Sequence, residues 1–433
     1  MVKKRPTLRF HRVMVTVIDG DLRRVVRGAR VRLGHSSGTT NRHGVVYLRV
    51  RRRTSLLVTV GKRRYTTATH RVGFRRRPFT QFRIYQPRLQ WRFYGATPTR
   101  TQAQTRIRVR PPFRVVWSRA IGGLIEFPAV VSDGMAYIGN FYGTVRAISM
   151  RNGTVAWKHQ TPNGKMAASP AVDGDQIVAH GMDGHVWVLD RSSGRLRWHY
   201  TVGSPVESSP IVRDGVDYFG SWNGNVYALD LRRHRVRWVY RGGYKITSSA
   251  ALAGGTLFIG DYGGRLLALS ARTGRLRWSV SVNGRIYGTP AVDHGRVFVP
   301  SSDGNSLTAF STRGRRLWSI HTGSYVYSSP AVWAGRVFFG SYNGVFYCVS
   351  AASGHVLWEV GTGGPISGAA VVVDGVAYAG SFAHRIVGVD ARSGRVLLRF
   401  PHGHYVPVSG NGGRLLLHGY SRLYAVEPRR ARR

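Results

Sequence analysis

The stretch "ALSARTGRLRW", residues 268–278, is repeated with small changes along most of this chain. Related phrases are "AISMRNGTVAW" (147–157), "VLDRSSGRLRW" (188–198) and "CVSAASGHVLW" (348–358). A phrase that recurs at a fixed distance is usually one structural unit that is repeated. The fold therefore depends on what one such unit builds.

Tryptophans mark the period, because they recur at intervals of 40 or 41 residues, and Leu398 takes the next position. They are Trp117, Trp157, Trp198, Trp238, Trp278, Trp318 and Trp358. Each unit has a "S-S-P-A-V" strand, an apolar strand such as 336–341, a short Gly/Asn/Asp hairpin, a third strand, and a last strand that ends in tryptophan. Four strands in about 40 residues are typical of a β-propeller blade.

The third-strand phrase occurs eight times, and the last copy, "LYAVE" (423–427), has no fourth strand after it. The strand "RVVWSRA" (114–120) precedes the first unit and has no unit of its own. We expect these two strands to share a blade, which leaves no free edge at the seam. The sequence thus predicts an all-β protein with an eight-bladed β-propeller over residues 114–429.

The turn before each tryptophan has a local physical reason. Asp190, Asp230 and Asp390 can accept backbone N–H groups there, and a glycine such as Gly274 supplies a left-handed residue. We expect each tryptophan to cover a glycine of the neighbouring blade, so the seven tryptophans are assigned a structural docking role. His234 occupies one glycine position, and we expect that turn to be strained or altered.

The pattern "A-x-D-x-x-T-G-x-x-x-W" resembles the docking motif of the quinoprotein (PQQ) propeller repeat, over roughly residues 88–429. The lead "WRFYGATPTRT" (91–101) also resembles the segment before the propeller in that family. The resemblance implies one of two classes of protein. One holds pyrroloquinoline quinone and calcium on the central axis as an alcohol or aldose dehydrogenase. The other is a scaffold without cofactor, such as the propeller lipoprotein of the outer-membrane barrel-assembly machinery.

The residues favour the scaffold class. The resemblance implies a stacking plane made by a disulfide between adjacent cysteines, and Cys348 is the one cysteine. Calcium takes several oxygen ligands, whereas most acids here occupy turns. The 16 histidines show no metal-ligand spacing, and "HGH" (402–404) is interpreted as a turn. We therefore expect no catalytic residue, metal or cofactor, and a PQQ-dependent dehydrogenase is the alternative.

Aromatic residues of the hairpins suggest a binding face. They are Phe141, Tyr142, Trp222, Tyr262, Tyr342, Phe382 and Tyr420. The position three residues before the first-strand proline or its equivalent, two residues in the case of Pro407, should face the central funnel. It reads Ile125, Ala167, Glu207, Thr247, Tyr287, Tyr327, Ser367 and Tyr405. The candidate ligand-binding residues are Glu207, Tyr287, Tyr327, Tyr405, Trp222 and Arg285. A water-filled funnel and aromatics stacked on neighbouring blades are the alternatives, and the expected partner is a protein or a polysaccharide.

Residues 8–86 contain short β-rich runs and are predicted to form a small antiparallel sandwich. The phrase "VRGARVRLGHSSGTTNRHGVVYLRV" (26–50) resembles the carboxypeptidase regulatory-like, transthyretin-type domain, with Thr40, Gly44 and Leu48 in the hairpin positions. The resemblance implies an accessory binding or spacer domain. Residues 87–113 read as a linker, but Trp91, Phe93 and Tyr94 predict that it packs on the propeller.

The net charge is +46, of which residues 1–112 carry +27. Basic clusters lie at 51–53 and 75–77, so a third hypothesis is a polyanion-binding protein that uses the Arg-rich first domain. The alternative is a compositional bias, because 59 of the 65 cations are arginine. No apolar run is long enough for a transmembrane span or a signal peptide. We expect a monomer of the cell envelope or surface by resemblance, while a cytoplasmic location stays open.

Overall fold

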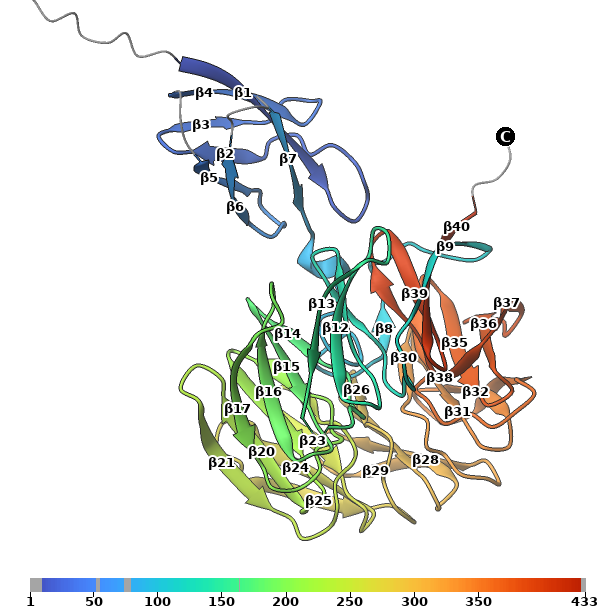
Figure 1. Cartoon of the computed structure of the whole chain (residues 1–433). Coiled ribbons are helices and arrows are strands. Elements are labelled where there is room, and N and C mark those ends of the chain that lie inside the picture. Colours follow the sequence, from blue (N-terminus) through green and yellow to red (C-terminus); the bar gives the residue numbers. More distant parts are fainter. Residues whose placement is uncertain (1–9, 52–54, 74–78, 163, 430–433) are drawn as a thin grey trace, which may run out of the picture. The chain divides into compact units, whose positions relative to one another are not determined.

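A computed structural model describes residues 10–51, 55–73, 79–162 and 164–429 (Figure 1). The chain divides into two compact units, Met1–Gln90 and Trp91–Arg433. Arg52 and Arg53 of the first basic cluster and residues 75–77 of the second lie outside the described residues.

The first unit has two sheets that share one hydrophobic core. One sheet has the order β4 (Val45–Arg51), β1 (Phe10–Asp19), β7 (Phe79–Ile84), and the other has the order β3 (Ser36–Thr39), β2 (Arg30–Leu33), β5 (Ser55–Gly61), β6 (Ala68–Gly73). Val13, Val15 and Val17 alternate with partly exposed residues along β1, as expected of a strand with one buried face. A short 3₁₀ helix, η1 (Pro87–Leu89), follows β7.

The second unit consists of successive four-stranded antiparallel sheets (Figure 1). The first three are β10 (Val130–Ser132), β11 (Met135–Gly139), β12 (Thr144–Ser149), β13 (Val155–Gln160); β14 (Ala171–Asp173), β15 (Gln176–His180), β16 (His185–Asp190), β17 (Leu196–Thr201); and β18 (Ile211–Arg213), β19 (Val216–Gly220), β20 (Asn225–Asp230), β21 (Arg235–Arg241). The next three are β22 (Ala251–Ala253), β23 (Thr256–Gly260), β24 (Arg265–Ser270), β25 (Leu276–Ser281); β26 (Ala291–Asp293), β27 (Arg296–Ser301), β28 (Ser306–Ser311), β29 (Arg316–His321); and β30 (Ala331–Trp333), β31 (Arg336–Gly340), β32 (Val345–Ser350), β33 (Val356–Gly361).

The last two sheets take strands from the beginning of the unit. The short strand β8 (Ala103–Gln104) joins the sheet of β34 (Val371–Val373), β35 (Val376–Ser381), β36 (Arg385–Asp390) and β37 (Val396–Pro401). The strand β9 (Phe113–Ala120) pairs antiparallel with β40 (Arg422–Pro428), beside β39 (Arg414–Gly419) and β38 (Gly403–Asn411). Each third-to-fourth strand pair shifts register at the same place, for example at Ala268/Leu269, and β40 and β9 shift at Ala425/Val426. β9 therefore takes the place of a fourth strand.

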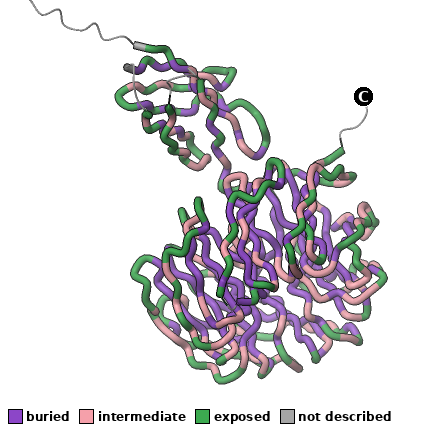
Figure 2. The backbone as a smooth tube through the Cα atoms, viewed as in Figure 1, coloured by how far each residue is buried: buried purple, intermediate pink, exposed green. Residues whose placement is uncertain are grey.

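The first strands of the sheets follow one another around the unit. β10 lies next to β14 and β14 next to β18; β22, β26, β30, β34 and β38 follow one another, and β38 lies next to β10. Serines of the "S-S-P" phrase join the units, because Ser169 N–H donates to Ser209 Oγ at 3.1 Å and Ser209 N–H to Ser249 Oγ at 2.8 Å. The central strands of the sheets are buried (Figure 2).

The tryptophans of the last strands lie against the turns of the following sheets. A Cβ added to Gly274 would lie 2.5 Å from Cε3 of Trp238, and Trp238 Nε1 donates to the carbonyl of Ala271 at 3.1 Å. Trp117, Trp157, Trp278, Trp318 and Trp358 lie in the same way against Gly153, Gly194, Gly314, Gly354 and Gly394. Trp198 instead stacks on His234, whose φ of 53° is left-handed without being glycine. That turn is thus altered where the glycine is missing.

The segment 91–104 runs around the ring and bonds to its inner strands. Backbone N–H groups of β22, β26, β30 and β34 donate in turn to the carbonyls of Pro98, Thr99, Thr101 and Gln102. Arg100 is fully buried and donates to the carbonyls of Ala250, Ser209, Pro210 and Tyr94. Burial lowers the pKa of Arg100 to about 10, so its guanidinium stays charged near neutral pH.

Candidate functional site

The loops that lead into the first strands meet around a small cavity on the ring axis. Tyr287, Tyr327 and Tyr405 line it together with Glu126, and the cavity volume is about 40 Å³. Thr247, Ser367 and Phe127 also line it. Tyr94 of the segment 91–104 closes one side, since it is buried and donates from Oη to Ser329 Oγ at 3.0 Å.

Two glutamates approach one tyrosine hydroxyl at this cavity. Tyr287 Oη lies 2.7 Å from Glu207 Oε1 and 3.5 Å from Glu126 Oε1. Glu207 also accepts a hydrogen bond at 3.0 Å from Trp222 Nε1. A buried carboxylate is stable only where donors satisfy it, and Glu207 has two such donors.

Burial changes the ionisation of this group. Desolvation and then the nearby charge of Glu207 raise the pKa of Glu126 to about 7. Desolvation also raises the pKa of Glu207, although its bonds to Tyr287 and Trp222 and the charge of Lys245 oppose the rise. Burial next to these carboxylates raises the pKa of Tyr287 well above its usual range, so Tyr287 keeps its proton. Near neutral pH the site thus carries a carboxylate that is partly protonated.

Two cations lie beside Glu207, held by aromatic rings. Lys245 Nζ is 3.3 Å from the ring centre of Trp222 and 4.8 Å from that of Tyr262. Arg285 lies 5.7 Å above Tyr262 and forms an exposed ion pair with Asp303 at 3.0 Å. Desolvation lowers the pKa of Lys245, and the charge of Glu207 opposes this. Trp222 and Arg285, both among the predicted residues, therefore flank the axial cavity and do not line it.

An arc of rings continues from the cavity across the same face. Tyr327 contacts Tyr287 at 5.4 Å and Tyr342 at 5.0 Å between ring centres, and Tyr342 contacts Phe382 at 5.8 Å. Phe382 contacts Tyr405 at 5.5 Å, and Tyr325 is 46% exposed beside Tyr327 and Tyr342. We call Tyr325, Tyr327, Tyr342, Phe382 and Tyr405 the aromatic arc. Rings held by one another lose little freedom on binding, which suits a contact surface.

The sequence prediction was wrong at one position of the funnel. Ile125 is buried in the hydrophobic core, and the neighbouring Glu126 lines the cavity. Counting back from Pro128 fails because the first unit has one residue fewer before its proline. The buried apolar residues Val206, Ile246, Ile286, Val326 and Ile366 precede the funnel position in the other units. Counting forward from that residue would have selected Glu126.

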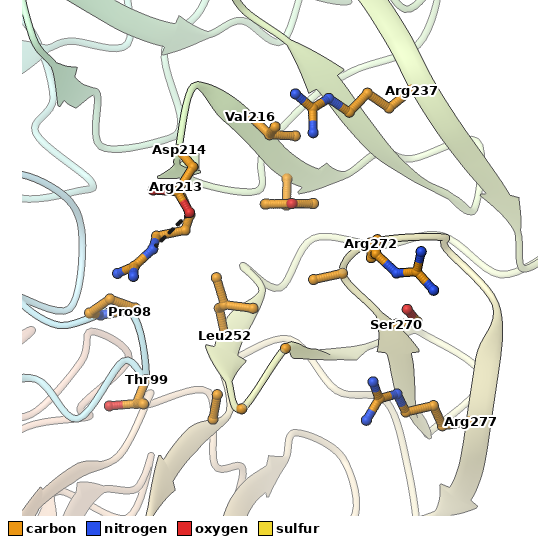
Figure 3. A pocket seen from close by; sticks show the side chains of 15 residues that line it. Pro98, Thr99, Arg213, Asp214, Val216, Arg237, Leu252, Ser270, Arg272 and Arg277 are labelled. Carbon is orange, nitrogen blue, oxygen red and sulfur yellow. Dashed lines mark hydrogen bonds and ion pairs between the residues drawn. The ribbon is translucent and has the colours of Figure 1, made fainter.

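A larger cleft lies elsewhere, between the sheet of β18–β21 and that of β22–β25, and contains none of the predicted residues. Its volume is about 840 Å³, and Figure 3 shows four arginines around an apolar floor that includes Val216 and Leu252. They are Arg213, Arg237, Arg272 and Arg277. Arg213 pairs with Asp214 and Arg237 with Asp230. Because arginines are abundant over the whole sequence, four arginines in this cleft are weak evidence for a binding site.

No group of three or more His, Cys, Asp or Glu side chains in the described part of the chain could hold a metal ion. No helix within the same residues is both long and apolar enough to cross a bilayer.

The repeated region, residues 114–429, is similar to known proteins. Residues 114–245, 223–329 and 323–429 match the family described as outer membrane protein assembly factor BamB. Outer membrane protein assembly factor BamB of Taylorella asinigenitalis is 29% identical over 92 residues, which cover 19% of this chain and 24% of that protein. Quinoprotein ethanol dehydrogenase of Pseudomonas aeruginosa is 29% identical over 101 residues, which cover 21% of this chain and 16% of that protein. The chain thus spans a quarter or less of either curated relative.

Solved structures resemble this chain at low identity. The structure of BamB from Moraxella catarrhalis aligns with this chain with a TM-score of 0.62 and 20% sequence identity. The alignment covers 75% of this chain and 100% of the BamB chain. The structure of quinohemoprotein alcohol dehydrogenase from Comamonas testosteroni aligns with a TM-score of 0.67 and 13% sequence identity. The alignment covers 78% of this chain and 80% of the dehydrogenase chain. These similarities show the fold, a β-propeller of the quinoprotein type. Since the matched segments together span 114–429, the chain belongs to the family of outer membrane protein assembly factor BamB.

Proposed function

We propose that the protein is a non-catalytic binding scaffold of the cell envelope, which uses the axial face of an eight-bladed propeller to hold a protein partner. In this proposal residues 8–86 form a carboxypeptidase regulatory-like sandwich, 87–113 a connector that packs on the propeller, and 114–429 the propeller. The two sheets of the first unit and the register shift shared by β9 support the boundaries. The envelope location and the choice of a protein over a polysaccharide rest on the family.

The aromatic arc is the observation that carries the proposal. Tyr325, Tyr327, Tyr342 and Phe382 come from loops and Tyr405 from the start of β38, in three successive sheets, and their rings touch one another in a chain. Rigid aromatic side chains on loops are enriched in protein interfaces, because they bury a large area with few rotatable bonds. A scaffold needs such a surface, and catalysis does not.

The residues on the axis do not fit pyrroloquinoline quinone. The axial cavity of about 40 Å³ has room for about three water molecules, whereas the quinone is a three-ring molecule with three carboxylates. Cys348 is the one cysteine of the sequence and is buried in β32, so no disulfide between adjacent cysteines can form a stacking plane. Glu126 and Glu207 would face the carboxylates of the quinone with like charge. No quinone-dependent step is therefore part of the proposal.

Site-specific photo-cross-linking in the host cell tests the proposal. In one variant a photoreactive phenylalanine analogue replaces Tyr325 (46% exposed) of the aromatic arc. In the other it replaces Leu357 (43% exposed) on β33, the outer strand of the sheet β30–β33. We expect the first position to cross-link one protein of the outer membrane assembly machinery, identified by mass spectrometry. The second position is the matched control, with similar exposure and no predicted contact with the partner.

Equal cross-linking from both positions, or cross-linking from neither, would contradict the proposed face. A cross-link from Tyr325 to a protein outside the cell envelope would contradict the proposed location but would still support the proposed binding face. The chain is expected to be monomeric apart from that partner.

A second candidate function, contact with a polyanion, is favoured by the surface of the first unit. Its two acids, Asp19 and Asp21, are 2% and 4% exposed and accept hydrogen bonds from Gln86 and Gln90 within the unit. Three arginines of this unit are exposed: Arg12, which lies over the half-exposed Tyr47, Arg49 and Arg83. Among the described residues of this unit, no exposed carboxylate lies near them. Binding of heparin that persists at about 0.5 M NaCl would support a built site, since diffuse attraction is lost at that salt concentration.

A further inference from the structure

The geometry points to the axial cavity as a binding site for a primary alkylammonium group, such as a lysine side chain of a partner or a free alkylamine. The inference rests on the proposed function in taking the axial face as the binding face. It adds the chemical class of the group that enters the cavity.

The distribution of glutamates is the first argument. The chain of 433 residues has four glutamates against 65 lysines and arginines. Two of the four, Glu126 and Glu207, come from different units and meet around Tyr287. In a chain with a net charge of +46, two carboxylates that converge on the axis make the cavity locally anionic, which attracts a cation.

Glu126 has acceptor capacity that the protein does not use. A carboxylate can accept about four hydrogen bonds. Within the described residues, the one donor near Glu126 is the Tyr287 hydroxyl at 3.5 Å, and the single proton of that hydroxyl is already donated to Glu207 at 2.7 Å. A partly buried carboxylate with so weak a partner is costly, and an entering ammonium would supply up to three donors.

The walls of the cavity suit an organic cation better than a metal ion. Tyr287, Tyr327 and Tyr405 present rings, and a cation near an aromatic face gains energy from the ring quadrupole. The volume of about 40 Å³ accepts an –NH₃⁺ group, which is close to water in size, while the alkyl stem extends past the rings. A metal ion would need more oxygen ligands than two carboxylates supply.

The neighbouring cations do not compete for Glu126. Lys245 is held over Trp222 and Tyr262 on the side of Glu207, and Arg285 is paired with Asp303. The buried Arg100 donates to carbonyls of the residues just before β18 and β22. The charge of Glu207 acts on Glu126, and no cation does so among the described residues. The unmatched carboxylate is therefore Glu126.

Isothermal titration of the full chain with n-butylammonium chloride at pH 8 tests the inference. We expect saturable millimolar binding, at least tenfold weaker binding to Glu126→Gln, and unchanged binding to Glu359→Gln. Glu359 lies exposed on β33, so Glu359→Gln removes the same charge away from the axis. 1-Butanol, the neutral analogue, should not bind at the same concentrations. Equal affinity of Glu126→Gln and the unaltered chain, or binding of 1-butanol with equal affinity, would overturn the inference.

A second variant and a second ligand sharpen the result. Tyr405→Leu removes a ring and keeps the carboxylates, and it should weaken binding severalfold if the ring contacts the cation. N-acetyl-lysine N-methylamide should bind where butylammonium does. Tighter binding of the lysine derivative assigns the group to a protein partner, and tighter binding of butylammonium assigns it to a small amine.

The two proposals fail separately. If Tyr325 cross-links the assembly machinery but butylammonium does not bind, the axial inference is overturned and the scaffold stands. If butylammonium binds but no partner cross-links, the site stands and the protein scaffold falls.

Discussion

Glu126 is the residue on which the chemistry of the axial face depends. It is a titratable group near neutral pH that is held in the folded chain next to a second carboxylate. An acid whose pKa is higher in the folded than in the unfolded state stabilises the fold at low pH, and this contribution is lost as pH rises. Glu126 therefore costs stability above its folded pKa of about 7 and costs nothing below its unfolded value of 4.5.

Replacement by glutamine tests this cost. We expect Glu126→Gln to raise the free energy of unfolding at pH 8 by up to about 3 kcal/mol, since each pKa unit corresponds to about 1.4 kcal/mol. At pH 4 the variant and the unaltered chain should unfold alike. Urea unfolding at both pH values measures the difference, with Glu359→Gln as the control. A variant as unstable as the unaltered chain at pH 8 would contradict the ionisation described for Glu126.

At this scale the sequence predicted the type of residue better than its position. Glu207, Tyr287, Tyr327 and Tyr405 follow from the variable position of an otherwise uniform repeat, and the structure places them at or beside one cavity. Glu126 was missed because its unit lacks one residue before the proline. The contacts of Lys245 with Trp222 and Tyr262 could not be predicted, because the sequence does not contain the orientation of neighbouring hairpins.

At the scale of the element, the contact of a tryptophan with a glycine joins most sheets to the next, and Trp198 stacks on His234 where the glycine is missing. Gly274 combines a left-handed φ of 71° with Trp238 pressed against its Cα. Gly255 has nearly the same φ, 72°, with no atom within 4 Å of an added Cβ. A substitution at Gly255 measures the cost of backbone strain alone, and a substitution at Gly274 adds the cost of displacing the Trp238 ring.

Alanine at the two positions gives the comparison. Gly255→Ala should lower the free energy of unfolding by about 1 kcal/mol, the cost of a left-handed non-glycine residue. Gly274→Ala should cost about 2 kcal/mol more, because the new Cβ clashes with a packed ring. Thermal unfolding followed by circular dichroism measures both. Equal losses would mean that the tryptophan does not hold the sheets together through this contact.

The all-β class and the four-stranded sheets were predictable from the repeat, because alternating apolar residues and regularly spaced turns set the strands locally. The register shift between third and fourth strands, as at Ala268/Leu269, was not. Nor was the course of the segment 91–104, whose carbonyls accept from successive inner strands. Both depend on how units meet, which the spacing of one unit does not contain.

On the scale of the whole molecule, His418 spans the seam where the ring closes. Ala129 N–H, just before β10, donates to His418 Nε2 on β39 at 3.1 Å, and the other ring nitrogen lies 3.3 Å from the carbonyl of Pro407. Burial lowers the pKa of His418 to about 4. A histidine that is neutral when folded contributes stability above its unfolded pKa of 6.5, and this contribution is lost as pH falls toward 4.

His418→Gln keeps a polar side chain that does not titrate. Between pH 7 and pH 4, the unaltered chain should lose up to about 3 kcal/mol more than the variant. This slope is opposite in sign to that of Glu126 in the same pH range, so each variant is compared with the unaltered chain at every pH. Urea unfolding from pH 4 to pH 7 provides the data. Parallel pH profiles would remove His418 from the account of the seam.

In the proposed function this ring is a binding scaffold and not a quinone-dependent enzyme. The most direct measurement adds one equivalent of pyrroloquinoline quinone and excess calcium to the purified chain, then follows bound quinone by absorbance and dye reduction with ethanol or glucose. We predict no saturable binding and no dye reduction above that of the free quinone. Stoichiometric binding with substrate-dependent dye reduction would contradict the claim.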